Sequence, residues 1–207
     1  MMYDYTNITA QTIPETHRHA VYNVWNFGKE CIDERGDSIK EFLNMVIRIP
    51  AKDCSHVPGF ERMDNDFKNG ILNKDVAKKK GESFVYAYGA RVHQDDQLEE
   101  TIQELIDNPT TRRAFIPIYQ PQDNDGREDV PCWTSLQFIL RKTQLHLTDY
   151  FRSNDMMFAF PSDAFGARSL QHYVADKIGS EVGTFTHVIG SAHIRMTDAD
   201  AVIDFLS

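Results

Sequence analysis

The spacing of apolar residues changes along the chain, and each kind of spacing predicts a different element. Apolar side chains that recur at helical intervals predict helices, whereas alternation and short apolar runs predict strands. The helices predicted in this way cover residues 15–34, 98–106 and 162–178, and the strands cover residues 42–49, 83–92, 114–119, 133–141, 145–151 and 184–190. Residues 58–80 and 120–129 show neither pattern and are predicted to be loops.

Short local signals set several boundaries. The Asn108-Pro109 pair ends the second helix, because the residue before a proline disfavours helical backbone. Ser162 is a good N-cap for the third helix. The polar run at 142–144 joins the flanking strands into a hairpin. Strands and helices mix without a regular strand–helix–strand alternation, which predicts an α+β fold.

Length and composition indicate one globular domain over residues 1–207. Hydrophobic residues make up 41% and charged residues 26%, which is ordinary for a soluble protein. No apolar run is long enough to span a bilayer, and the N-terminus lacks the pattern of a signal peptide. With only three cysteines, we expect a cytoplasmic protein without a disulfide scaffold.

The formal net charge of −9 argues against general binding to nucleic acid or to an anionic membrane. A small phosphate ligand is still compatible with this charge, because a local arginine cluster can hold it. Arg112 and Arg113 offer such a cluster, since a guanidinium suits phosphate geometry. The alternative is that at least one of them is simply solvated.

Cys132 is a candidate nucleophile, because it follows a proline at the start of a predicted strand. A nucleophilic thiol needs a cation nearby in space, and Arg152 lies on the return strand of the same hairpin. The alternative is that Cys132 is a small buried apolar residue and Arg152 a solvated strand end.

Two short pairs of potential metal ligands occur without further ligands nearby. They are His17 with His19, and Cys54 with His56. Because a zinc site needs about four ligands, we expect surface residues and no metal.

Asp163 lies in the segment FPSDAF, at the start of a predicted helix. A carboxylate at this place is either a charge favoured by the helix dipole or a group that binds a ligand.

The motifs "RR", "PCW…LQF", "FRSND", "FPSD" and "GSAH" follow one another between Thr110 and His193. In this order and spacing they resemble the thymidylate synthase family. The resemblance implies a single α+β domain and a homodimer joined by packed sheets. It also implies a pyrimidine nucleoside monophosphate as substrate.

The resemblance implies a role for each matched residue. Cys132 matches the nucleophile that attacks C6 of the pyrimidine, whose C5 then takes a one-carbon unit from 5,10-methylenetetrahydrofolate. The other matches are phosphate ligands (Arg152 and Ser153, with Arg112 and Arg113 from the other subunit), folate contacts (Asp155, with Phe158 and Ala159), a residue near the reacting carbons (Tyr88), a sugar-hydroxyl ligand (His193) and, more loosely, the Arg35 segment.

One departure from the family concerns the base. Thymidylate synthases carry an asparagine at the position of Asp163, where it donates to O4 and accepts from N3–H of uracil. The related deoxycytidylate hydroxymethylases carry aspartate there. Because a carboxylate presents two acceptors, it suits the N4 amino group and a protonated N3 of cytosine.

Other departures concern folate and sugar. No tryptophan lies between Asp53 and Gly89, where synthases place aromatic residues that shape hydride transfer. The candidates for the general base are Glu61 and then Asp64. Arg195 replaces a sugar-binding tyrosine, which leaves ribose and deoxyribose both open. The chain also ends soon after His193, where synthases continue into a tail that closes over folate.

The sequence thus predicts a C5 hydroxymethyltransferase of cytidine or deoxycytidine monophosphate. The alternatives are methylation at the same carbon and a nucleotide-binding relative that has lost folate chemistry. The pathway, whether phage DNA modification or a nucleoside natural product, stays open.

Overall fold

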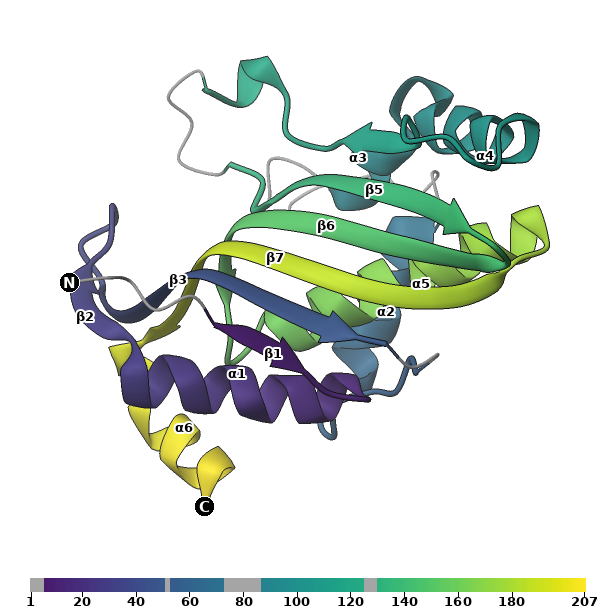
Figure 1. Cartoon of the computed structure of the whole chain (residues 1–207). Coiled ribbons are helices and arrows are strands. Elements are labelled where there is room, and N and C mark those ends of the chain that lie inside the picture. Colours follow the sequence, from purple (N-terminus) through teal and green to yellow (C-terminus); the bar gives the residue numbers. More distant parts are fainter. Residues whose placement is uncertain (1–5, 51–52, 73–86, 125–129) are drawn as a thin grey trace.

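The computed structural model describes residues 6–50, 53–72, 87–124 and 130–207. Seven strands within these residues form one sheet in the order β1-β3-β7-β6-β5-β4, with β2 paired to β3 (Figure 1). The strands are β1 (Asn7–Thr9), β2 (Lys29–Ile32), β3 (Ser38–Ile49), β4 (Phe115–Pro117), β5 (Trp133–Arg141), β6 (Gln144–Asp155) and β7 (Glu181–Arg195).

The sheet is mixed. β7 runs parallel to β6 and antiparallel to β3, while β5 and β6 form the hairpin predicted from the sequence. A mixed sheet packed against helices confirms the predicted α+β class.

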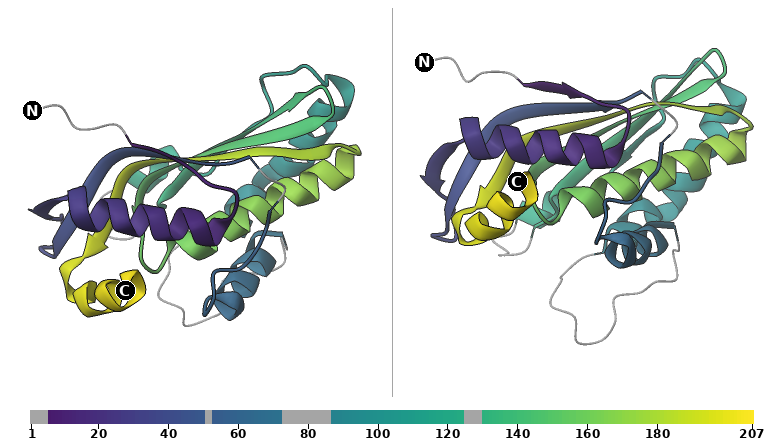
Figure 2. Two further views of the ribbon diagram at one scale, coloured as in Figure 1. Left: turned by 60° about the horizontal axis from the view of Figure 1, so that its bottom comes forward. Right: turned by 90° about the horizontal axis from the view of Figure 1, so that it is seen from below.

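Helices cover one face of this sheet. α1, α2, α5 and α6 all lie on the same side of it, as the two views in Figure 2 show. The helices are α1 (Ile13–Phe27), α2 (Glu61–Leu72), α3 (Tyr88–Val92), α4 (Gln97–Asp107), α5 (Phe160–Ile178) and α6 (Ala199–Leu206), with 3₁₀ turns η1 (Gln94–Asp96), η2 (Pro121–Asn124) and η3 (Met196–Asp198).

Alternation along the central strands sends one set of side chains into the core beneath the helices. On β6, Leu145, Leu147 and Phe151 are buried, whereas Thr148 and Tyr150 on the other face are exposed. Asp149 falls in the buried row of this strand, so its carboxylate is enclosed by the fold.

The first helix is shorter than the sequence predicted. It begins with a capping box, in which the Glu15 N–H donates to Thr12 Oγ1 at 3.2 Å and the Thr12 N–H donates to the Glu15 carboxylate at 3.2 Å. It ends at Phe27, because Gly28 turns into an extended conformation and β2 pairs with β3 instead. The predicted helix over 28–34 is therefore wrong.

The predicted strand at 83–92 is also wrong over the residues that the structure describes. Residues 88–92 form the short helix α3, while residues 83–86 lie outside the described part. A Cβ on Gly89 would come within 1.7 Å of the Gly70 carbonyl oxygen, so α3 packs closely on α2. This tertiary contact prevails over the strand propensity of the aromatic and β-branched residues.

Two further expectations need correction. The predicted loop at 58–80 contains helix α2, with residues 73–80 outside the described part. Ser162 is not an N-cap, because α5 starts two residues earlier at Phe160. Its Oγ instead donates to Asp64 Oδ1 on α2, at 2.8 Å.

Candidate functional site

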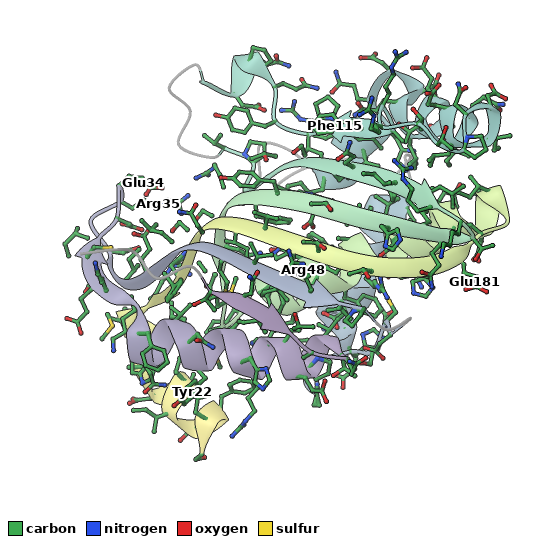
Figure 3. All side chains as sticks on the ribbon, viewed as in Figure 1. Tyr22, Glu34, Arg35, Arg48, Phe115 and Glu181 are labelled. Atoms are coloured by element: carbon green, nitrogen blue, oxygen red, sulfur yellow. The ribbon has the colours of Figure 1, made fainter. Side chains whose placement is uncertain are left out.

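Strand order and register bring most of the predicted site residues to one end of the sheet. β5 begins there, directly after Cys132, and β6 and β7 end there. Trp133 pairs with Phe151, and Asp155 pairs with His193. Figure 3 labels Arg35 near this end of the sheet and Glu181 at the opposite end.

Cys132 and Arg152 lie side by side through their backbones. The Arg152 N–H donates to the Cys132 carbonyl at 2.9 Å. The Arg152 guanidinium lies along the two residues before Cys132. Its Nε donates to the Pro131 carbonyl at 3.0 Å and its Nη2 to the Val130 carbonyl at 2.9 Å. A guanidinium is thus fixed along the backbone of the segment that carries the partly buried thiol.

Tyr88 joins this group from α3. Its hydroxyl oxygen accepts the N–H of Trp133, the residue after Cys132, at 3.2 Å. Its ring makes edge contacts with Trp133, Phe151 and Phe67 of α2. Helix α3 therefore holds a phenol hydroxyl next to the start of β5.

The ends of β6 and β7 contribute a second polar group. Asp155 Oδ1 accepts the backbone N–H groups of Met157 and Phe158, at 2.9 and 3.2 Å. Its Oδ2 lies 3.4 Å from Nη1 of Arg195. Asp155 therefore holds both the turn before α5 and Arg195, which stands where the resemblance places a sugar-binding tyrosine.

Ser153 and His193 form a pair at the same strand ends. Ser153 Oγ lies 3.3 Å from Nδ1 of His193, and both side chains are half-buried. A hydroxyl and an imidazole so placed can donate to phosphate or sugar oxygens.

Asp163 lies in the first turn of α5 with 8% of its surface exposed. Burial, with the charges of Asp149 and Asp155, raises the pKa of Asp163 well above that of an ordinary aspartate, while a hydrogen bond from Asn154 opposes this rise. No other side chain among the described residues hydrogen-bonds its carboxyl group. A buried carboxyl group with spare hydrogen-bonding capacity is suited to a ligand.

Three buried polar residues next to Asp163 were missed by the sequence analysis. They are Asn154, His187 and Asp149, with 2%, 0% and 1% of their surface exposed. His187 Nδ1 lies 2.7 Å from Asp149 Oδ1, and its Nε2 lies 3.2 Å from Asn154 Nδ2. Alternation on β6 could have revealed Asp149, which shares the buried row with Leu147 and Phe151.

The two candidates for the general base occupy different environments. Glu61 is fully exposed at the start of α2, where it accepts the Gly59 N–H at 3.0 Å. Asp64 is completely buried one turn later, between His56 Nδ1 at 2.9 Å and Ser162 Oγ at 2.8 Å. Asp64 touches the first turn of α5, next to Asp163, and Glu61 does not.

The other arginines predicted to bind phosphate or substrate, Arg35, Arg112 and Arg113, are exposed. Arg35 lies in the turn between β2 and β3. Arg112 and Arg113 precede β4, whose first residue Phe115 pairs with Gln137 in the middle of β5. The register therefore does not bring this pair to Cys132 of the same chain.

One of the expected folate contacts, Phe158, lines a surface hollow. A hollow of about 500 Å³ is lined by Gly59, Phe60, Arg62, Met63, Asp66 and Phe158. Phe158 is 41% exposed, so its ring is available to a flat ligand. These residues fit an aromatic co-substrate bound between α2 and the turn before α5.

Three residues expected on the surface lie deeper. His17 is buried, with Nε2 3.2 Å from the Met157 carbonyl oxygen, and burial lowers its pKa to about 4. Cys54 is partly buried against Ser169, and burial raises its pKa. His56 pairs with Asp64, as described above. His19 is exposed, as expected.

Two general features complete the description. None of the described helices is long and apolar enough to cross a membrane. Within the described ranges, no three His, Cys, Asp or Glu side chains are grouped so that they could hold a metal ion.

Comparison with known proteins gives consistent matches. A family model described as "Thymidylate synthase" matches residues 15–207. Proteins named "Putative thymidylate synthase" from Methanococcoides burtonii and Methanosarcina mazei are 33% and 32% identical over 199 residues, covering 94% of this chain and 92% of each relative. "Thymidylate synthase" of Listeria monocytogenes is 26% identical over 201 residues, which cover 92% of this chain and 63% of that protein.

Proposed function

Because the chain belongs to the thymidylate synthase family, we propose that it transfers a one-carbon unit to C5 of cytidine or deoxycytidine monophosphate and leaves a hydroxymethyl group. The family uses methylenetetrahydrofolate as co-substrate and acts on a pyrimidine nucleotide. The preference for cytosine and the hydroxymethyl product are the parts that we add.

Asp163 carries the proposal. Cytosine presents an amino donor at N4 and an acceptor at N3, so it pairs with a carboxyl group that shares one proton with N3. Because burial raises the pKa of Asp163, this side chain can itself bring the proton. A proton on N3 also stabilises the negative charge that moves into the ring when a thiolate adds to C6, so the same contact serves binding and chemistry.

Cys132 supplies the nucleophile in this proposal. Its sulfur forms a bond to C6, and the C5–C6 electron pair becomes available at C5. Arg152 stabilises the thiolate, and Tyr88 lies beside the next residue, where it can move a proton near C5. When the product leaves, the carbon–sulfur bond breaks and the thiolate is restored.

The co-substrate supplies a carbon at the oxidation level of formaldehyde. We place it against Phe158, Ala159 and Asp155, next to the hollow described above. After C5 bonds to this carbon, loss of the C5 proton and of tetrahydrofolate leaves an exocyclic methylene. Without the tryptophan that serves hydride transfer in synthases, water can add to this methylene carbon as the bond to sulfur breaks. For the general base, the buried position of Asp64 makes it a better candidate than the exposed Glu61.

We further propose that residues 1–207 form one catalytic domain that works as a homodimer. The face of the sheet opposite the helices exposes Tyr150 of β6, which is 41% accessible, and Phe115 of β4, which is 49% accessible. A second copy would cover this face and bring its Arg112 and Arg113 to the phosphate. The free cysteines suit a reducing compartment such as the cytoplasm.

Tritium release provides the test. The protein is incubated with methylenetetrahydrofolate and with CMP, dCMP, UMP or dUMP carrying tritium at C5, and the products are identified by mass. Release from a cytosine nucleotide with a hydroxymethyl product supports the proposal. A methyl product supports the first alternative, and nucleotide binding without release supports a protein that has lost folate chemistry.

A further inference from the structure

Asp64, the candidate general base, is enclosed by the fold. It lies in the first turn of α2, and its side chain is 0% exposed. Its Oδ1 accepts the hydroxyl of Ser162 at 2.8 Å, and its Oδ2 lies 2.9 Å from Nδ1 of His56. Burying a carboxylate costs free energy unless the charge is paired. A base enclosed in this way also cannot exchange a proton directly with water.

His56 connects this carboxylate to the surface. The side chain of His56 is 31% exposed, whereas Ser162, the other partner of Asp64, is only 4% exposed. Nε2, on the other side of the imidazole ring from Nδ1, has no hydrogen-bond partner among the described residues. Within the described part of the chain, His56 is therefore the only group bonded to the Asp64 carboxylate that also reaches solvent.

Packing against α5 restrains the orientation of the imidazole ring. Phe165, which is 4% exposed, stacks on His56 with the ring centroids 4.1 Å apart and an angle of 24° between the planes. This stacking keeps Nδ1 on Asp64 and leaves Nε2 on the opposite side. Glu61 of α2 is a second acidic side chain whose charge interacts with His56, but it is fully exposed, so water and salt screen it.

The pair of His56 and Asp64 can exchange protons without changing its total charge. As imidazolium and carboxylate the two groups carry opposite charges, and as imidazole and carboxylic acid neither is charged. When Asp64 takes a proton from the substrate side, His56 can release one from Nε2 to water, and the reverse steps restore the pair. Because an uncompensated charge in the protein interior is costly, this compensation favours proton transfer to a buried base.

The proposed reaction needs such an exchange. C5 gives up one proton and the attacking water another, while the two folate nitrogens each take one as their bonds to the transferred carbon break. Ser162 and Asp163 are adjacent in the first turn of α5, so the hydrogen bond from Ser162 holds Asp64 against the turn proposed to contact the base. We propose that His56 is a positioning residue for Asp64 and exchanges protons with solvent on its behalf. The inference rests on the proposed function, because it assigns the route of the protons in that reaction.

Variants of His56 separate this role from a structural one. His56→Asn places an amide nitrogen near the position of Nδ1, so it keeps a donor to Asp64 but cannot exchange a proton. His56→Ala removes the ring and leaves a space beside Phe165 that free imidazole can fill. His19→Ala is the matched control, because His19 is an exposed histidine on α1.

Turnover is measured with the intact protein as C5 tritium release at neutral pH in a buffer without imidazole. Nucleotide affinity by calorimetry and thermal unfolding are recorded in parallel. We expect both His56 variants to lower kcat by about 100-fold, the lower end of the contribution of general acid–base catalysis, and to keep nucleotide affinity within a few-fold. Added imidazole should raise kcat of His56→Ala in proportion to its concentration. It should leave the wild type, His56→Asn and His19→Ala unchanged.

The outcomes separate this inference from the proposed function. Wild-type kcat in the His56→Asn protein would show that the hydrogen bond alone suffices, which overturns the exchange role. A loss in His56→Ala that imidazole does not restore, with or without a lower melting temperature, makes the histidine structural and overturns it as well. The assay uses whichever nucleotide the wild type turns over, so a uracil preference refutes the proposed function and leaves this test intact. A wild type that releases no tritium from any nucleotide refutes both.

Discussion

Replacing Asp163 by asparagine is the most informative single change in this protein. The two side chains are nearly isosteric, but asparagine must present one donor and one acceptor. Toward uracil it can donate to O4 and accept from N3–H. In that same orientation the amide N–H faces the N4 amino group of cytosine and the amide oxygen faces the bare N3. The reversed amide can accept from N4–H and donate to N3, but it has no proton to transfer to N3 when the thiolate adds to C6. We therefore expect the Asp163→Asn protein to lose activity on the cytosine nucleotide and to gain activity on its uracil counterpart.

The size of the change follows from the burial of the site. Asp163 is 8% exposed, so water cannot replace a lost partner. Each mismatched buried group costs about 1–3 kcal/mol. Two such mismatches would lower kcat/KM for the cytosine nucleotide by roughly 30-fold to 10⁴-fold, since each factor of ten corresponds to about 1.4 kcal/mol. Sites that hydrogen-bond their substrate achieve discrimination of this order.

Stability gives an independent measurement on the same variant. Burial raises the pKa of Asp163 in the folded protein above the ordinary aspartate value of 3.8. The folded state is therefore favoured while Asp163 is neutral, and this stability is lost as the pH rises through the folded pKa. Asparagine has no charge to bury, so the variant should unfold at a higher temperature than the wild type at alkaline pH, and the difference should shrink below about pH 4.

The assay is C5 tritium release from paired cytosine and uracil nucleotides, with thermal unfolding between pH 4 and pH 9. If Asp163→Asn keeps the cytosine preference of the wild type, Asp163 is only a charge at a helix start. The substrate assignment would then fail. If the variant loses activity on both nucleotides and also unfolds at a lower temperature, the role of the carboxyl group is structural.

Four further predictions concern other residues. Cys132→Ser should abolish tritium release and leave nucleotide affinity within a few-fold, because the thiol acts after binding; turnover near the wild-type level would contradict its role. Mixing inactive Arg113→Ala and Cys132→Ser proteins should restore activity through heterodimers with one intact site, and a mixture as inactive as its parents would exclude a shared site. Arg195→Tyr should shift the ratio of CMP to dCMP turnover toward the deoxynucleotide, and an unchanged ratio would remove Arg195 from sugar selection. Gly89→Ala should lower the free energy of unfolding by about 1–3 kcal/mol in a denaturant titration, since its Cβ would meet the Gly70 carbonyl oxygen; wild-type stability would show that α3 can shift.

Several elements were predictable because their signals are local. The hairpin of β5 and β6 follows from two β-rich runs around a polar turn, and α4 follows from an apolar face that ends before Asn108-Pro109. The motifs that contain Cys132, Arg152 and Asp155 are also local, since each is a short run of neighbouring residues. What the sequence alone determined was thus the α+β class, the family, and a short set of candidate residues.

The tertiary structure decided which of these residues act on one another. In the structure β6 and β7 extend beyond the predicted strands, so that Asp155 pairs with His193. Asp64 is buried, whereas Glu61 is exposed to solvent. These outcomes depend on register and on packing between distant segments, which no local pattern encodes.

The environment of Asp163 shows this division most clearly. The sequence marks it as a carboxylate at a helix start, and comparison with the family suggests that it contacts the base. Only the fold places Asn154, His187 and Asp149 behind it, because the parallel pairing of β6 with β7 sets Asp149 opposite His187. A side chain's pKa and its proton position depend on neighbours in space, so they were decided when the strands paired and α5 covered them.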